Sequence, residues 1–406
     1  MKRCTLLALS VLIAIVLAQA TGTSVSAQDT TRVDDHLVVH EWGTFTSIAG
    51  KQGVSVEWRP LAGTSDLPSF VYQSADATSG KGYRSGQPCS KCNLEALVRM
   101  ETPVLYFYTD RETSVSVRVD FPKGQITEWY PHARIVSTGA SNGSIDWGRF
   151  TVLPGATPQL PIEQRESHYY PARETDSAPL QVCGARATEF EKFLFYRGVG
   201  NVDLPVAVSL DGNRLLLNNR GRDVIRNVVV FENRRGKVGY RMEDLAGGEV
   251  SIARPELVRD IDSLQRDLEQ TLVRHGLYER EARAMLKTWR DSWFEEGLRL
   301  FYILPRGLTD TVLPVSIDPT PSDLVRVLMA RTEIITPEVE QAIALQVAKL
   351  TDPSLEVRER ALKAIRAYGR FAEPVLKRIR EGTLDRETRS QIDKLIRKVC
   401  GARFQV

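Results

Sequence analysis

Histidine and carboxylate residues in the first half of the chain have the chemistry to hold a metal or move protons. His40 and Glu41 are adjacent and lie among apolar residues. No second histidine follows four positions later, so the pair is not the helical zinc-protease motif. In a strand the two side chains would point to opposite faces. If both side chains are buried, we expect a structural polar pair whose hydrogen bonds are made by backbone or arginine groups. The alternative is a functional site in which burial perturbs the pKa values.

A second polar group lies around Pro131. Strand alternation would place four side chains on one face, namely Glu128, Tyr130, His132 and Arg134. A carboxylate, phenol, imidazole and guanidinium on one face can bind a polar ligand. Pro131 favours the other interpretation, in which these side chains form the solvated face of an edge strand.

The third group follows at residues 168–176, where His168 and Arg173 accompany two tyrosines and two carboxylates. If this segment paired near His40 or His132, three histidines would converge. Three histidines are enough for a catalytic metal with an open coordination position. The candidate metal ligands are therefore His40, His132 and His168, and the cofactor itself stays unknown.

Cys89 and Cys92 form a CxxC motif. With Cys183 and Cys400 they leave an even number of cysteines after the first apolar segment. In an oxidising compartment the pair favours a disulfide that staples an exposed loop. A redox motif, or a zinc site that also uses Cys183 and His168, stays open as an alternative.

The first residues indicate export. Lys2 and Arg3 precede an uncharged apolar run over residues 6–18, and small-residue cleavage signatures follow. This pattern is typical of a secretory signal peptide, here residues 1–27, and the run is shorter than a membrane span. We expect a periplasmic or extracellular protein with no transmembrane segment in the mature chain. A formal net charge of +3 points to no specific nucleic acid as a partner.

The elements that would position these groups are strands first and helices later. Residues 28–200 read as a β-rich domain of short strands separated by Gly, Pro, Asn and Asp. Residues 201–253 resemble a portion of an immunoglobulin-like β-sandwich, with a hairpin turn at Asp211-Gly212. Residues 254–335 predict a helical hairpin, with apolar spacings of three and four, followed by short strands.

The last segment, residues 336–406, predicts helices throughout. Residues 352–361 resemble the opening of a HEAT-type repeat, and residues 368–376 resemble its inter-helix turn and second helix. Residues 353–406 contain 14 Lys and Arg against 7 Asp and Glu, a net of 14 − 7 = +7. These basic helices could contact a protein or the cell envelope, although a solvated face explains them equally.

Four strings in the chain resemble a family of uncharacterised exported bacterial proteins. They are the HEWGTFT string within residues 39–46 and the segments at 100–108, 195–200 and 289–294. The resemblance implies no activity and carries over no catalytic residues. The expected fold class is α+β and multidomain, with N-terminal antiparallel β-sandwich regions, a helical hairpin and a C-terminal HEAT-like α-helical repeat.

Three functions are compatible with these observations. No nucleophile-elbow serine, P-loop or dinucleotide fingerprint is present. The first hypothesis is an exported envelope or extracellular protein that binds a ligand or partner. The alternative is a metal-dependent or acid/base hydrolase acting on extracellular material, and a second alternative is a thiol–disulfide protein.

Overall fold

The structure is a computed structural model that describes residues 33–62, 66–74, 94–138, 141–184, 186–384 and 386–400. The described residues belong to one compact unit that begins at Arg32. The predicted signal peptide and the predicted disulfide between Cys89 and Cys92 lie outside the described residues.

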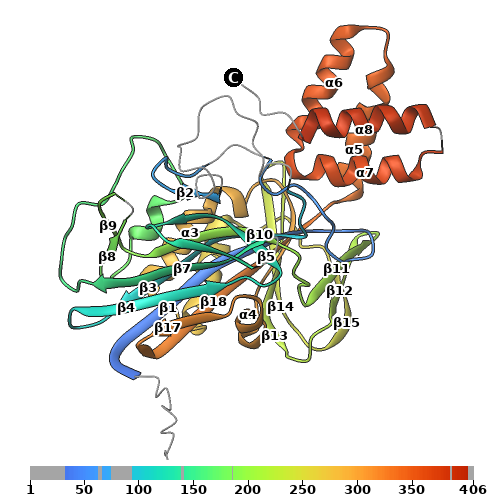
Figure 1. The fold of residues 1–406 in the computed structure, drawn as a ribbon. Helices are drawn as coiled ribbons and strands as arrows, with labels where there is room; N and C mark the ends of the chain where they lie inside the picture. Colours follow the sequence, from blue (N-terminus) through green and yellow to red (C-terminus); the bar gives the residue numbers. More distant parts are fainter. Residues whose placement is uncertain are drawn as a thin grey trace, which may run out of the picture. The chain divides into compact units, whose positions relative to one another are not determined.

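A mixed sheet of nine strands forms the centre of this unit (Figure 1). Its order is β14 (Lys237–Leu245), β13 (Ile225–Arg234), β16 (Gly297–Ile303), β18 (Thr320–Ile334), β1 (Val33–Ala49), β3 (Val98–Tyr108), β10 (Leu194–Gly200), β5 (Gly124–Tyr130) and β2 (Tyr72–Gln73). β1 and β18 pair in parallel, whereas β1 pairs antiparallel with β3. Among the described residues, the first and last strands are therefore neighbours at the middle of the sheet.

Two smaller sheets share an apolar core with one face of the nine-stranded sheet. The first contains β11 (Val206–Asp211), β12 (Arg214–Asn219) and β15 (Gly248–Ala253). The second contains β17 (Val315–Asp318), β4 (Thr113–Asp120), β7 (Ser141–Val152), β8 (Leu180–Cys183), β9 (Thr188–Glu191) and β6 (Arg134–Thr138). Phe45 of β1, Val117 of β4 and Leu217 of β12 are buried in this one cluster.

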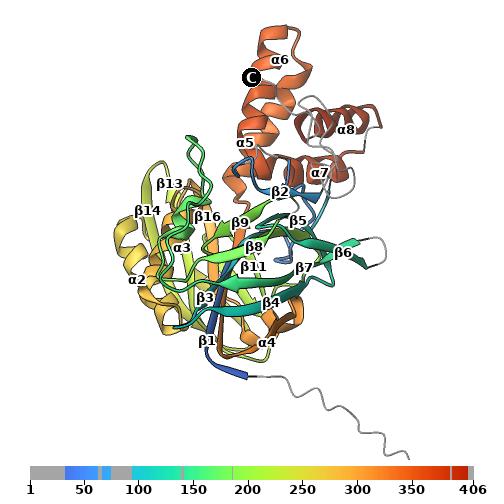
Figure 2. The same ribbon diagram turned by 60° about the vertical axis from the view of Figure 1, so that its left-hand side comes forward.

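Two antiparallel helices cover the other face of the sheet (Figure 2). They are α2 (Ile261–Arg274), whose N-terminus is capped by Asp260, and α3 (Glu279–Trp293). Their apolar stripes, including Leu268 and Trp293, pack with Trp42 of β1. The helical hairpin predicted from the spacing of apolar residues is confirmed.

The chain ends in a group of four helices. They are α5 (Pro337–Ala348), α6 (Leu355–Ala367), α7 (Ala372–Gly382) and α8 (Arg386–Cys400), with short 3-10 turns η3 (Lys349–Thr351) and η4 (Gly369–Phe371). Ile365 and Leu376 are fully buried among them, and Leu362 is only partly buried. The same cluster includes Ile48 and Trp58 from the β part of the chain.

The predicted fold class is wrong. The sheet is mixed rather than antiparallel, and it collects strands from residue 33 to residue 334 instead of forming an N-terminal sandwich. The predicted immunoglobulin-like portion is divided, because β13 pairs with β16 of the nine-stranded sheet while β11 and β12 belong to another. Local periodicity identifies a strand but not its partner. The boundaries at 200, 253 and 335, as limits of folding units, stay predictions.

The predicted HEAT-like repeat is also wrong. A repeat array extends because each hairpin packs only on its neighbours. Here α5 contacts both α6 and α7, and α8 contacts both α7 and α6, so the helices close around a single apolar cluster.

Two further expectations concern cysteines and membranes. The expected disulfide gains no support, since the described part of the chain contains none and Cys183 is free and exposed. Within the same residues, no helix has both the length and the apolar character needed to cross a bilayer.

Candidate functional site

The four strings that carry the family resemblance lie close together in space. Residues 39–46, 100–108 and 195–200 fall in β1, β3 and β10, which are consecutive neighbours in the sheet. Residues 289–294 end α3, which covers the same face. Segments far apart in sequence therefore meet over one part of the nine-stranded sheet.

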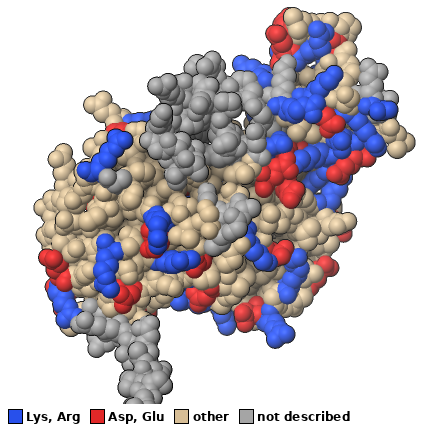
Figure 3. Space-filling view, viewed as in Figure 1, with Lys and Arg blue, Asp and Glu red and all other residues tan. Residues whose placement is uncertain are grey.

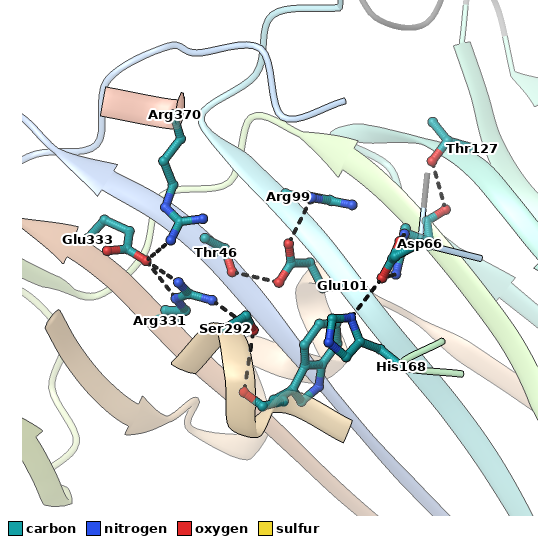
Figure 4. Close-up of polar contacts among 12 residues, drawn as sticks. Thr46, Asp66, Arg99, Glu101, Thr127, His168, Ser292, Arg331, Glu333 and Arg370 are labelled. Atoms are coloured by element: carbon teal, nitrogen blue, oxygen red, sulfur yellow. Dashed lines mark hydrogen bonds and ion pairs between the residues drawn. The ribbon is translucent and has the colours of Figure 1, made fainter. Parts of the chain in front are cut away.

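This part of the sheet is polar. We define the polar floor as six side chains, Thr46, Arg99, Glu101, Arg197, Arg331 and Glu333. All of them except Arg197 are labelled in Figure 4. Thr46 is paired across the sheet with Arg331 of β18 and with Arg99 of β3. Much of the rest of this face is apolar and packs on α2 and α3, although His40 on it pairs with Glu281 of α3.

Backbone irregularities mark the edge of the polar floor. The register between β1 and β3 shifts between Trp42 and Thr44, and that between β3 and β10 shifts between Phe195 and Gly198. Such bulges redirect the side chains that follow them. Thr102 has a φ of +50°, which is rare for a β-branched residue. Strain of this kind collects at functional sites.

Glu101 is the carboxylate at the centre of the floor. Its Oε1 lies 3.1 Å from Nη1 of Arg99, and its Oε2 accepts a hydrogen bond of 3.1 Å from the Thr46 hydroxyl. Burial alone would raise the pKa of Glu101. Four guanidinium groups outweigh this effect and hold that pKa below its usual value. They belong to Arg99, Arg331, Arg197 and Arg370.

Arg331, Glu333 and Arg370 form a network beside Glu101. The Nε of Arg331 donates a hydrogen bond of 2.7 Å to Oε1 of Glu333. Arg370 of η4 places its Nη2 3.3 Å from the same oxygen, so a C-terminal residue reaches the sheet. Nη1 of Arg331 donates to the Ser292 hydroxyl of α3 at 3.4 Å. The network ties the sheet to α3 and to the C-terminal helices.

Four hydrogen-bond donors without partners lie in or beside the polar floor. The Nε atoms of Arg99, Arg197 and Arg370 and the Nε1 of Trp289 are buried without a hydrogen-bond partner among the described residues. Arg197 and Trp289 are only 2% and 3% exposed. Buried polar groups are normally satisfied, so a cluster of unpaired N–H groups is suited to a ligand that supplies acceptors.

Asp66 and His168 form one side of the site. Asp66 accepts a hydrogen bond of 2.9 Å from Nη1 of Arg197, and its other oxygen lies 3.2 Å from Nδ1 of His168. This contact with Asp66 raises the pKa of His168 above its usual value. The His168 ring centroid lies 5.9 Å from that of Trp289.

The predicted pair His40 and Glu41 is divided between the two faces of the sheet, as strand alternation predicts. Nδ1 of His40 lies 2.7 Å from Oε2 of Glu281 in α3. Glu41 accepts a hydrogen bond of 2.5 Å from Nε of Arg326 and another from the Tyr196 hydroxyl. Each side chain therefore has its own buried partners.

The second predicted group does not share one face. The carboxylate of Glu128 accepts a hydrogen bond of 2.5 Å from the Thr127 hydroxyl. Arg134 belongs to β6 of another sheet, where it pairs with Asp146 at 2.7 Å. The alternation ends at Pro131, before His132, whose ring centroid lies 5.5 Å from that of Tyr72. The strand assumed from the sequence is really two strands in different sheets.

The third predicted group contributes only His168 to the site. Arg173 lies in η2 (Tyr170–Arg173) and donates to both oxygens of the fully buried Glu191. His40, His132 and His168 each lie in different surroundings, and the described residues contain no group of three or more His, Cys, Asp and Glu side chains suited to a metal.

Sequence reasoning missed most of the floor. Arg99, Glu101, Arg197 and Arg331 were not among the predicted site residues, although Glu101 and Arg197 lie in the strings of the family resemblance. The usable signal was a charged residue inside an apolar, strand-like segment, because such a charge needs a partner when buried.

Comparison with known proteins identifies no family. No protein-family profile matches the chain, and no curated protein does. Among solved structures, the yeast delta-COP-I mu-homology domain is similar over 74% of this chain and 98% of its own, with 6% identity and a TM-score of 0.31. A TM-score this low carries no argument about fold or function.

Proposed function

We propose that this chain is an exported binding protein that holds a small anionic ligand on the polar floor. The observation that carries the proposal is the set of buried, unpaired N–H groups of Arg99, Arg197, Arg370 and Trp289 beside Glu101. All four are donors, so the missing partner is an acceptor. Guanidinium groups suit the planar oxygens of a carboxylate, phosphate or sulfate.

The raised pKa of His168 supports binding over hydrolysis. Its contact with Asp66 raises its pKa, so the imidazole carries a positive charge over a wider pH range and is a weaker candidate for a general base. The Ser292 hydroxyl contacts Arg331 and donates to the backbone oxygen of Trp289. Neither the guanidinium of Arg331 nor the backbone oxygen of Trp289 can act as a general base for Ser292. The arrangements of His168 and of Ser292 therefore both favour anion binding over hydrolysis.

Export and a partner surface belong to the same proposal. The signal-like N-terminus supports a periplasmic or extracellular location. Figure 3 shows many Lys and Arg side chains on the C-terminal helices. Lys363, Lys394 and Arg397 of these helices are exposed. Asp and Glu side chains interrupt this surface, and Arg380 pairs with Asp393 at 2.5 Å. A partner at the cell envelope would contact the exposed cations of these helices.

Calorimetric titration of the mature chain with sulfate, phosphate and acetate tests the proposal. Arg99 and Arg370 are suitable targets because their side chains are 23% and 25% exposed, so replacement disturbs packing less than it would at Arg197. R99M and R370M should each raise the Kd at least about tenfold, which corresponds to 1.4 kcal/mol. Added salt should also weaken binding.

The matched control is R149M, which removes an exposed arginine paired with Asp318 in another sheet region. Its Kd should equal that of the unmodified chain. If all three anions fail to bind, or if R99M and R149M have the same effect, the proposed site is wrong.

A further inference from the structure

A separate cavity of about 500 Å³ lies at the opposite end of β3 from the polar floor. Tyr108, the last residue of β3, lines it, whereas Arg99 of the floor lies near the first. At the usual strand rise these two residues are roughly 30 Å apart. The cavity volume is within the range of small-molecule sites. The two sites are therefore spatially distinct.

The walls of the cavity are largely apolar and stiff. The segment after β7 contributes Pro154, Ala156, Pro158 and Leu160, and the segment before β8 contributes Ala178 and Pro179. Proline fixes its backbone φ, so a wall with three prolines loses little conformational entropy when a ligand binds. Such a wall suits an apolar ligand body.

Lys192 and Asp176 are the charged side chains that line the cavity, and Asp176 pairs with Arg280. Nζ of Lys192 donates a hydrogen bond to the backbone oxygen of Thr175, and no ion pair joins it to a carboxylate in the described part of the chain. An ammonium group has three N–H donors. The remaining donors of Lys192 are available to a ligand in the cavity.

Tyr108 is held in place from behind the cavity. Its hydroxyl donates a hydrogen bond of 2.8 Å to Oε1 of Glu281, which is fully buried. The other oxygen of Glu281 lies 2.7 Å from Nδ1 of His40, and the ring of Tyr278 packs edge-on against Tyr108 with centroids 4.9 Å apart. The phenol is thus a rigid part of the wall, and its oxygen can still accept a hydrogen bond.

We propose that this cavity binds a small organic carboxylate with an apolar body. The carboxylate would pair with the Lys192 ammonium, and the body would lie against the prolines and the Tyr108 ring. A neutral ligand would form no ion pair with the ammonium, and a short carboxylate would leave the apolar walls uncovered. The proposal does not depend on the function proposed for the polar floor.

Benzoate is the probe, with benzyl alcohol as its neutral counterpart and acetate as the carboxylate without an apolar body. Titration of the mature chain should show benzoate binding at least about tenfold more tightly than either. K192M keeps the apolar stem but removes the charge, and it should weaken benzoate binding at least about tenfold. K192R keeps the charge and should bind benzoate more tightly than K192M does.

The benzoate titrations are repeated on R99M, which weakens carboxylate binding at the polar floor, so that the further change caused by K192M reports on the cavity alone. A156W should fill the cavity and abolish binding. The inference is overturned if benzyl alcohol binds as tightly as benzoate, or if K192M and A156W both bind benzoate normally. If K192M fails to fold, the comparison of the probes on the unmodified chain and on A156W still decides the question.

Discussion

Gly43 of β1 lies so close to Pro103 of β3 that a Cβ on Gly43 would stand 2.9 Å from the Cα of Pro103. This contact sits at the register shift between Trp42 and Thr44. On one side of it most of the sheet face is apolar and packs on α2 and α3, and on the other side the polar floor begins. The close approach of two strands thus separates the structural part of the face from the candidate site.

G43A should therefore destabilise the protein. The added methyl group would meet backbone atoms that cannot rotate away, and overpacking of this kind costs about 1–3 kcal/mol. Urea denaturation measures the change in the free energy of unfolding. The control is G307A in α4 (Arg306–Val312), where a Cβ meets nothing within 4 Å. A G43A variant as stable as G307A would show that the strands separate easily at this position.

The buried pair of Glu41 and Arg326 gives a second prediction. Both side chains are 0% exposed, and Nε of Arg326 lies 2.5 Å from Oε2 of Glu41. R326M leaves a buried carboxylate without its cation and should cost about 3–5 kcal/mol. The double variant E41L/R326M removes both charges and should recover much of this loss. In urea denaturation, the double variant should lose less stability than the sum of the losses in E41L and R326M.

R149M is the control for the ion-pair prediction. Its partner Asp318 is 57% exposed, and exposed pairs contribute only about 0–1 kcal/mol. If R149M cost as much as R326M, or if the double variant E41L/R326M were less stable than R326M, burial of the pair would not explain its importance.

The third prediction concerns acid stability. Burial would raise the pKa of Glu101, but the neighbouring guanidinium groups lower it below the ordinary value of 4.5. A lowered carboxyl pKa stabilises the folded state above the unfolded pKa, and this stabilisation is lost as the pH falls through the folded pKa. E101Q should be less stable near neutral pH, with a shallower loss of stability below about pH 4.5. If the free energy of unfolding fell equally steeply with pH in E101Q and in the unmodified chain, the prediction would be wrong.

The fourth prediction concerns His168. The hydrogen bond to Asp66 is the main cause of its raised pKa, and burial and Arg197 oppose it while Asp291 assists. D66N should therefore lower the pKa of His168, which proton NMR measures from the imidazole resonances. A raised histidine pKa stabilises the folded state below the unfolded pKa, and this is lost as the pH rises through the folded pKa. D66N should remove that pH dependence.

D291N is the control for His168. Nε2 of His168 lies 4.0 Å from Asp291, whose side chain is 88% exposed, so solvent screens this interaction. Its effect on the pKa of His168 should be smaller than that of D66N. Equal effects would show that the hydrogen bond to Asp66 is not the dominant cause.

Local patterns were sufficient for several elements. The Asp211-Gly212 dipeptide predicts the hairpin between β11 and β12, and the spacing of apolar residues predicts α2 and α3. The alternation of a strand correctly divides His40 from Glu41, because successive side chains point to opposite faces. These features depend on residues within about ten positions of one another, and the sequence contains that information directly.

Only the tertiary structure decides which distant segments meet. Glu41 pairs with Arg326 from 285 positions away, and Asp66 pairs with Arg197 from 131 positions away. The parallel pairing of β1 with β18 creates the polar floor by placing Thr46 beside Arg331. A strand pattern specifies two faces and an edge but not the partner at that edge. The charged residues of the site can therefore be recognised as one group only from the order of the strands in the sheet.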